Sequence, residues 1–158
     1  MRRGRLVAGL ILFLLGRALP AIEAQQDLPS MGLAEIQSSR GLFLYIDFWA
    51  SWCGPCRQSF PWMAEMQSKY GTRGLRVVAV NLDAKRTDAE RFLAQTPANF
   101  EVVFDEKAES AKRLSIKTMP TSLLVSPEGR VLWVHSGFKK GEGSALETRI
   151  AAALASAR

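Results

Sequence analysis

Residues 47–57 read DFWASWCGPCR, and this stretch contains Cys53 and Cys56, the only cysteines of the chain. Pro55 lies where a first helical turn would begin, because its missing N–H and fixed φ suit that position. Cys53 would then stand at the start of a helix, with Cys56 three residues further on. Helix positions i and i+3 are neighbours on one face, near the separation that a disulfide requires. The spacing therefore predicts a cysteine pair at a helix N-terminus that can form a disulfide.

The chemistry expected of this pair is reversible thiol-disulfide exchange. Free backbone N–H groups and the helix dipole favour the thiolate of Cys53. We expect Cys53 to be an exposed nucleophile that attacks a partner disulfide, and Cys56 to be a shielded thiol that resolves the mixed disulfide. A structural bridge across two residues would close almost no loop and would contribute little stability. The alternatives are an inert surface motif and a zinc site, which would lack ligands because the chain has one His and no third Cys.

The segments around this stretch predict a strand, a helix and a second strand. Residues 42–49 (LFLYIDFW) form an apolar run with a single acid, which is typical of a central strand buried on both faces. A helix over residues 53–70 would end at Gly71 and Gly74. Residues 75–82 (LRVVAVNL) form a second apolar run. This order predicts a βαβ unit with parallel strands and a right-handed crossover.

The rest of the chain adds a second crossing and a hairpin. The sequence PEGR at 127–130 combines Pro and Gly, which is typical of a tight turn, so the strands on either side should pair antiparallel. The fold class predicted is α/β, with a mixed central sheet and helices on both faces. The expected elements are helices at 87–95, 108–114 and 144–157 and strands at 102–104, 121–126 and 131–136.

Asp47 is the one acid inside the first apolar run. A carboxylate is costly to bury in its ionised form, so Asp47 should be partly protonated near neutral pH. The functional interpretation is that Asp47 exchanges protons with Cys56 while the mixed disulfide is resolved. The structural alternative is a local hydrogen bond or cap at the end of the sheet.

The first 26 residues, MRRGRLVAGLILFLLGRALPAIEAQQ, resemble a secretory signal in their pattern. Three arginines precede ten apolar residues at 6–15, and a cut after Ala24 would leave a domain of residues 25–158. Ten helical residues rise about 15 Å, roughly half of a hydrocarbon core about 30 Å thick. We therefore expect residues 1–24 to be an export signal, with an uncleaved membrane tether as the alternative.

Composition supports one globular domain. The chain has 158 residues, of which 47% are hydrophobic and 23% charged, so a disordered or multi-span membrane protein is excluded. Its net charge is 21 − 15 = +6, but from Gln25 onward it is only 17 − 14 = +3. A nucleic-acid-binding protein would carry a stronger basic patch, so no nucleic-acid partner is expected.

Taken together, these motifs resemble the thioredoxin fold over residues 33–157. The resemblance is carried by DFWASWCGPCR at 47–57, by Pro61 five residues past Cys56, and by MPT at 119–121 before the predicted hairpin. It implies that Pro61 kinks the helix, and that the Met119–Pro120 peptide is cis and faces the dithiol. The substrate-binding residues that it implies are Trp52, Gly54, Pro55, Met119 and Pro120.

The 36 residues at 84–119 would form an αβ insertion before the cis-proline, and with the export signal they resemble the TlpA/ResA group of periplasmic thiol-disulfide reductases. The chain departs from its relatives at three positions. Asp47 stands where the TlpA/ResA group often has Asn, and Ser59 where many members carry Glu. Ala79 stands where thioredoxins have a Lys that pairs with the buried Asp.

The resemblance implies a periplasmic reductase that needs no bound cofactor or metal. Its partners would be cysteine-containing exported proteins, with apocytochrome c as one class of client, and a membrane protein that supplies electrons. We expect it to act as a monomer. The alternatives are a disulfide oxidant or isomerase, and a thioredoxin-fold module that binds clients without turnover.

Overall fold

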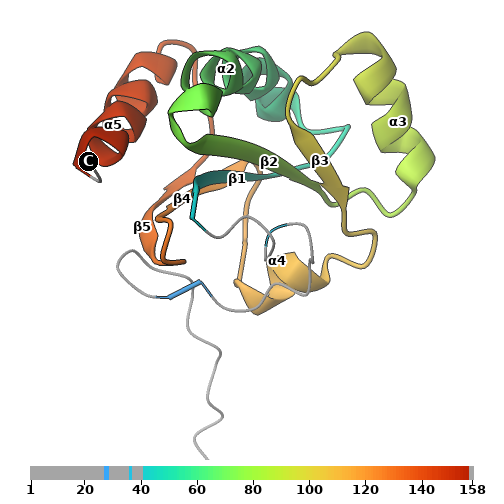
Figure 1. Cartoon of the computed structure of the whole chain (residues 1–158). Coiled ribbons are helices and arrows are strands. Elements are labelled where there is room, and N and C mark those ends of the chain that lie inside the picture. Colours follow the sequence, from blue (N-terminus) through green and yellow to red (C-terminus); the bar gives the residue numbers. More distant parts are fainter. Residues whose placement is uncertain (1–26, 29–35, 37–40, 157–158) are drawn as a thin grey trace, which may run out of the picture.

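The computed structural model describes residues 27–28, 36 and 41–156, arranged around a five-stranded sheet with the order β3-β2-β1-β4-β5 (Figure 1). The predicted signal segment, residues 1–24, lies outside the described residues. The strands are β1 (Phe43–Trp49), β2 (Leu75–Asn81), β3 (Glu101–Phe104), β4 (Thr121–Val125) and β5 (Val131–Ser136). The helices are α2 (Gly54–Tyr70), α3 (Arg86–Gln95), α4 (Glu109–Arg113) and α5 (Gly143–Ser156).

The sheet is mixed, as the sequence predicts. β1 pairs parallel with β2, and β2 pairs parallel with β3. β4 pairs antiparallel with both β1 and β5. The predicted βαβ unit and the predicted hairpin are therefore both confirmed. The αβ insertion places β3 at the edge of the sheet, next to β2.

Helices cover both faces of the sheet. α2, α3 and α5 lie on one face and α4 on the other (Figure 1). Side chains alternate along β1, because successive residues of a strand point to opposite faces. Tyr45 and Trp49 pack on the α2 side, while Ile46 and Phe48 pack on the α4 side. Asp47, between Ile46 and Phe48, therefore points toward α2.

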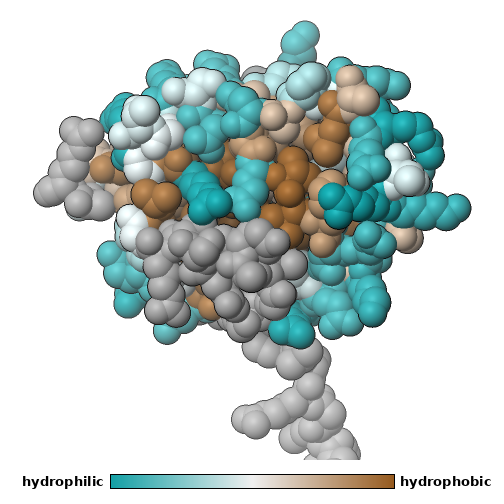
Figure 2. All heavy atoms as spheres, turned by 45° about the vertical axis from the view of Figure 1, so that its right-hand side comes forward, coloured by the Kyte–Doolittle hydropathy of each residue, from teal (hydrophilic) through white to brown (hydrophobic). Residues whose placement is uncertain are grey.

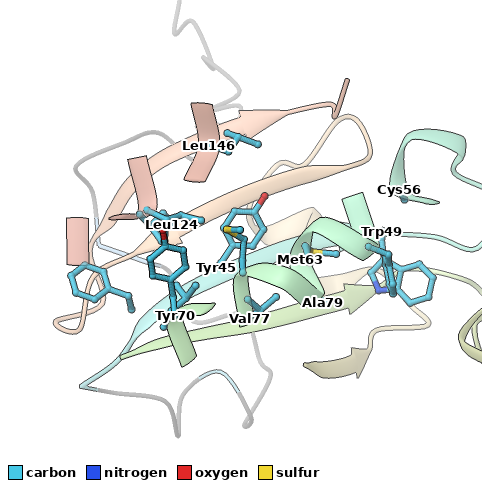
Figure 3. Close-up of a cluster of buried hydrophobic side chains, with 14 of the residues drawn as sticks. Tyr45, Trp49, Cys56, Met63, Tyr70, Val77, Ala79, Leu124 and Leu146 are labelled. Atoms are coloured by element: carbon cyan, nitrogen blue, oxygen red, sulfur yellow. The ribbon is translucent and has the colours of Figure 1, made fainter. Parts of the chain in front are cut away.

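Aromatic and aliphatic side chains fill the layer between the sheet and α2. Trp49 packs edge-on against Phe60 at 4.6 Å between ring centroids, and both rings contact Phe92 of α3. Figure 3 shows the same layer, into which side chains of the sheet, α2 and α5 project: Tyr45, Trp49, Val77, Ala79, Leu124, Cys56, Met63, Tyr70 and Leu146. This apolar layer holds α2, and with it the cysteine pair, on the sheet.

Two local details differ from the sequence expectation. Gly71 has right-handed backbone angles and begins a short 3-10 turn (Gly71–Arg73), so the reversal falls at Gly74, with φ 96°. A positive φ is costly for residues with a Cβ, which explains glycine there. α4 begins one residue later than expected because Ala108 has φ 51°.

The sheet edge formed by β3 lies on the side of the molecule that Figure 2 turns forward. Hydrophobic residues come to the surface in the middle of this face, with hydrophilic residues around them (Figure 2). The partly buried apolar residues of this segment, Phe100, Val102 and Phe104, pack against the α2-side core. The insertion therefore extends the core rather than forming a unit of its own.

Candidate functional site

Cys53 and Cys56 form a disulfide at the N-terminus of α2. Cys53 is the N-cap residue, and its Sγ accepts a hydrogen bond of 3.3 Å from the backbone N–H of Cys56. Gly54 and Pro55 occupy the first turn, as the sequence predicts. The Cα atoms of the two cysteines are 5.3 Å apart. The first turn of the helix therefore directs the backbone N–H of Cys56 to Sγ of Cys53, an arrangement that favours a thiolate at Cys53.

The two sulfurs differ in access, though less than the sequence suggests. Cys53 was expected to be exposed, but it is only 5% exposed, and Cys56 is fully buried. The prediction of an open nucleophile is thus wrong for the disulfide form, because the N-cap position turns the Cys53 sulfur against the first helical turn. Beside it, Trp52 is 71% exposed. Trp52 is therefore the most exposed of these three residues.

A buried carboxylate fixes the loop that leads into the cysteine pair. Asp83 accepts hydrogen bonds from the backbone N–H of Ser51 at 2.9 Å, from its hydroxyl at 3.0 Å, and from the amide of Asn81 at 2.7 Å. Asp83 is 2% exposed. The sequence analysis missed this cluster, although one signal was available. Asp83 follows a buried strand that runs parallel to β1, so both carboxyl ends reach the same sheet edge.

The Met119–Pro120 peptide is cis, as the resemblance implies. Met119 packs against the same core cluster that contains both cysteines. The backbone N–H of Gly137 donates to the carbonyl of Pro120 at 2.7 Å and ties the loop after β5 to this turn. The structure therefore brings the cis-proline loop to the core cluster of the cysteine pair.

Asp47 lies on the α2 face of β1 and is fully buried. Its Oδ1 accepts a 3.0 Å hydrogen bond from the Ser122 hydroxyl, which in turn accepts one of 2.8 Å from the Tyr45 hydroxyl. Its Oδ2 has no hydrogen-bond partner among the described residues. Burial raises the pKa of Asp47 from 3.8 to about 7, and the Ser122 bond acts in the opposite direction. The expected partial protonation near neutral pH agrees with this value.

Ala79 is the residue opposite Asp47 on β2. This register fits the position that the resemblance to thioredoxins assigns to Ala79, where those proteins have a Lys that pairs with the acid. Ser122 is the residue opposite Asp47 on β4. A neutral hydroxyl, rather than a cation, is thus the hydrogen-bond partner of the buried acid.

Two polar residues near Cys56, Arg57 and Ser59, donate hydrogen bonds to backbone carbonyls. Arg57 donates from Nη2 to the carbonyl of Ser51 at 3.0 Å, and its guanidinium lies 5.1 Å from the centroid of the Phe92 ring. Ser59 is buried and donates to the carbonyl of Cys56 at 3.0 Å. Pro61 lies inside α2 and has no N–H to give to the helix.

Trp49 and the single histidine of the sequence, His135, contact other parts of the fold. Trp49 is fully buried in the core. Nε2 of His135 lies 3.6 Å from a carboxylate oxygen of Glu142. Within the described ranges, no cluster of three or more His, Cys, Asp or Glu residues could hold a metal ion. Across the same residues, no helix has both the length and the apolar character needed to span a bilayer.

Known proteins resemble the chain in sequence and in structure. The thiol-disulfide oxidoreductase ResA of Bacillus subtilis is 31% identical over 103 residues, which are 65% of this chain and 58% of that protein. ResA of Oceanobacillus iheyensis is 28% identical over 128 residues, covering 80% of this chain and 67% of that protein. The chain therefore spans under two thirds of the length of Bacillus subtilis ResA.

The matches to solved structures of the same fold cover a larger share of the matched proteins. A Chlorobium tepidum protein described as a thiol:disulfide interchange protein, DsbE, is 48% identical with a TM-score of 0.80, and the match covers 85% of this chain and 99% of that one. StoA of Bacillus subtilis is 27% identical with a TM-score of 0.61, covering 69% and 82%. The Redoxin family model matches residues 15–152. With the thioredoxin fold around its cysteine pair, this match shows that the chain belongs to the Redoxin family.

Proposed function

We propose that this chain is an exported thiol-disulfide oxidoreductase whose reduced Cys53–Cys56 pair reduces disulfides in other proteins. The observation that carries the proposal is the placement of the pair at the N-terminus of α2, with Cys53 at the rim and Cys56 enclosed. Cys53 is 5% exposed and Cys56 is fully buried, so Cys53 is the sulfur that lies nearer to a partner. The ResA and DsbE relatives support the same chemistry.

The reaction runs in two exchange steps. The Cys53 thiolate attacks one sulfur of the client disulfide, so that a bond forms between Cys53 and the client while the client's own S–S bond breaks. Cys56 then loses its proton, attacks Sγ of Cys53, and releases the second client sulfur as a thiolate that takes up a proton. Two electrons pass from the protein to the client, and the Cys53–Cys56 disulfide forms.

The proposed roles follow from position. Trp52, Gly54 and Pro55 are exposed around Cys53, so they can contact a client chain directly. Met119 and Pro120 supply the neighbouring backbone, with the carbonyl and N–H of Met119 as the groups that pair with an extended client strand. Asp47, which points toward α2 from β1, accepts the proton of Cys56 during the second step.

The direction of electron flow follows from what stabilises the Cys53 thiolate. Between the two cysteines stand Gly54 and Pro55, which bring no charged or polar side chain to the sulfur. The guanidinium of Arg57 is engaged by the Ser51 carbonyl and the Phe92 ring. A thiolate without added stabilisation makes the dithiol a reductant rather than an oxidant.

The compartment and the partners complete the proposal. Residues 1–24 direct the protein to the periplasm, where the dithiol would be oxidised unless a membrane protein supplies electrons. Its clients are exported proteins with cysteines, among them apocytochromes c, and it acts as a monomer. Fractionation of cells that express the full chain tests the location, and recovery from the cytoplasm would contradict it.

Insulin reduction tests the proposed activity. With dithiothreitol as the electron source, the purified protein should speed the precipitation of insulin B chains well above the rate with dithiothreitol alone. The matched control is Cys53→Ser, which should show only the dithiothreitol rate. No acceleration by the unaltered protein would instead indicate a module that binds clients without turnover.

A further inference from the structure

We propose that Ser122 is a positioning residue for Asp47, and that it leaves Oδ2 as the carboxylate atom that exchanges a proton with Cys56. The proposal rests on the proposed exchange reaction and assigns a residue to its second step. The observation behind it is a buried series of two hydrogen bonds that joins three side chains from β1 and β4. Tyr45 donates to Ser122 at 2.8 Å, and Ser122 donates to Oδ1 of Asp47 at 3.0 Å.

The donor and acceptor in each of these two hydrogen bonds follow from the hydrogens that each group carries. An ionised carboxylate only accepts hydrogen bonds, so Ser122 must donate its one hydrogen to Asp47. The Ser122 oxygen then has a free acceptor site, which the Tyr45 hydroxyl fills. Ser122 is 2% exposed and Tyr45 is 1% exposed, so water does not compete for these bonds.

The same two hydrogen bonds can form whether Asp47 is ionised or protonated. Oδ1 accepts the Ser122 bond whether the acid is charged or neutral, whereas Oδ2 has no partner among the described residues. A proton can therefore join or leave Oδ2 without breaking either of these hydrogen bonds. Oδ2 belongs to a side chain that points toward α2, the helix from which Cys56 projects into the same buried layer (Figure 3).

Ser122 also replaces an ionic partner. The residue opposite Asp47 on β2 is Ala79, which cannot donate. A hydroxyl stabilises the carboxylate by a hydrogen bond without adding a charge, so Asp47 stays protonated up to a higher pH than it would beside a cation. Burial holds its pKa at about 7, with the Ser122 bond as the influence that lowers it.

Few titratable groups on this face of the sheet can disturb Asp47. Tyr45 lies on its own strand, and its pKa is well above the usual value because of burial and the nearby charge of Asp47. The titratable side chains that α2 and its N-cap bring to this layer are Cys53 and Cys56 in their reduced form and Tyr70, whose hydroxyl donates to Glu147 of α5 at 2.8 Å. β2 contributes the apolar Ala79. On β5, His135 lies opposite Ser122, one strand further from Asp47, and faces Glu142 at 3.6 Å.

In the resolving step, Oδ2 takes the proton of the Cys56 thiol, and the Cys56 sulfur forms its bond to Cys53 as the client thiolate leaves. The proton then passes from Oδ2 to the leaving thiolate or to water, which restores the carboxylate. Loss of the Ser122 hydroxyl removes a stabilising bond from the charged acid. The pH at which Asp47 ionises must then rise, and with it the pH at which resolution becomes fast.

The test compares the full chain with variants at position 122. Carboxyl carbon NMR follows the titration of Asp47 directly and needs no turnover. Ser122→Ala should move the titration midpoint upward by about one pH unit, the effect expected from losing one hydrogen bond to a charge. An unchanged midpoint would overturn the proposal.

Matched variants separate the hydroxyl from the packing. Ser122→Thr keeps the hydroxyl, and Ser122→Val has the shape of Thr without it. The Thr variant should titrate like the unaltered protein and the Val variant like Ser122→Ala, which also covers the case in which the Ala variant fails to fold. Equal midpoints for Thr and Val would overturn the proposal. Tyr45→Phe should shift the midpoint less than Ser122→Ala, and a larger shift would assign the role to Tyr45 instead.

Rate measurements then test whether Ser122 affects the resolution of the mixed disulfide through Asp47. The rate of mixed-disulfide resolution should fall about tenfold in Ser122→Ala at pH values below the midpoint, and this loss should vanish when Asp47→Asn is already present. A loss that persists in the Asp47→Asn background would show that Ser122 does not act through the acid. If the unaltered protein reduces no disulfide, the proposed function fails, while the NMR titration still decides the role of Ser122.

Discussion

Cys53 caps α2 and is 5% exposed, whereas Cys56 inside the helix is fully buried, so we expect a client to react with Cys53 first. Cys56→Ser should accumulate mixed disulfides with exported proteins, because Cys53 still attacks and no thiol remains to release the client. Cys53→Ser should not trap clients. Electrophoresis of cell extracts without reductant measures both variants. Equal trapping by the two would contradict the assignment of nucleophile and resolving thiol.

The raised pKa of Asp47 predicts how the stability of the protein depends on pH. The unfolded chain loses this proton near the ordinary value of 3.8, whereas the folded protein holds it until about 7. Stability therefore falls as the pH rises between these values, by up to about 4 kcal/mol at 1.36 kcal/mol per pH unit. Asp47→Asn removes that dependence. The variant should be more stable than the unaltered protein at pH 8 and similar to it at pH 4, measured by urea unfolding of the disulfide form.

The control for this measurement is Glu106→Gln, which removes an acid of the same charge from an exposed position. It should change the free energy of unfolding by no more than about 0.5 kcal/mol at either pH. If Asp47→Asn gains no stability at pH 8 relative to pH 4, then the acid is not held protonated by burial.

The ionisation of Asp47 also predicts how the rate of mixed-disulfide resolution depends on pH. As the pH rises through about 7, Asp47 becomes the carboxylate that accepts the Cys56 proton, so resolution should accelerate through this range. Asp47→Asn keeps the volume of the side chain and removes the proton acceptor. It should slow release of a model client near neutral pH and lose the acceleration, as followed by stopped-flow fluorescence. An unchanged pH profile would make Asp47 a structural residue.

The buried acid Asp47 could be predicted from the sequence, but its hydrogen-bond partner Ser122 could not. A single acid inside an apolar run is visible without any structure, since a buried charge is costly. The partner of that acid lies 75 residues away and depends on how β4 aligns with β1. Strand register follows from tertiary packing, and a shift by one residue would turn Ser122 to the other face.

The loop between β1 and α2 depends on Asp83, which predicts a second positioning effect. Asp83→Ala would leave the Ser51 N–H, the Ser51 hydroxyl and the Asn81 amide without their shared acceptor. The variant should lose about 2–4 kcal/mol of stability, since buried donors left unpaired cost about 1–3 kcal/mol each and part of that cost relaxes. Reaction of reduced Cys53 with a small disulfide should also slow, because the loop no longer fixes the helix start. Urea unfolding and stopped-flow mixing measure the two effects.

Asp88→Ala is the matched control, because Asp88 pairs with Arg91 at the surface of α3, where the Arg side chain is 75% exposed. Exposed ion pairs contribute little, so the expected change is within about 0.5 kcal/mol. Should Asp83→Ala and Asp88→Ala unfold at the same urea concentration, the loop would not depend on the buried carboxylate.

The boundaries of the elements were predictable because local signals mark them. Pro55 at the start of α2, the apolar runs of β1 and β2, and the turn before β5 all lie where the sequence places them. The end of α2 was less predictable, because Gly71 and Gly74 both satisfy the pattern. Only the backbone angles distinguish them, with the positive φ at Gly74.

At the scale of the whole molecule, the order of elements predicts the mixed sheet but not the burial of the site. Parallel and antiparallel pairing follow from connection length, since short turns join antiparallel strands and helices join parallel ones. The closeness of Cys53 to its own helical turn depends on atomic contacts that no pattern reports. For that reason the sequence predicts an exposed Cys53, whereas Cys53 in the disulfide form is only 5% exposed.

To reduce client disulfides, the Cys53–Cys56 pair must have a low reduction potential. Equilibration of the purified protein with glutathione buffers measures this potential directly. The Gly54–Pro55 pair and the engaged guanidinium of Arg57 predict a value nearer about −270 mV, as for thioredoxin, than the roughly −120 mV of a dedicated oxidant. A potential above about −180 mV, in the range of an isomerase or an oxidant, would contradict a reducing role.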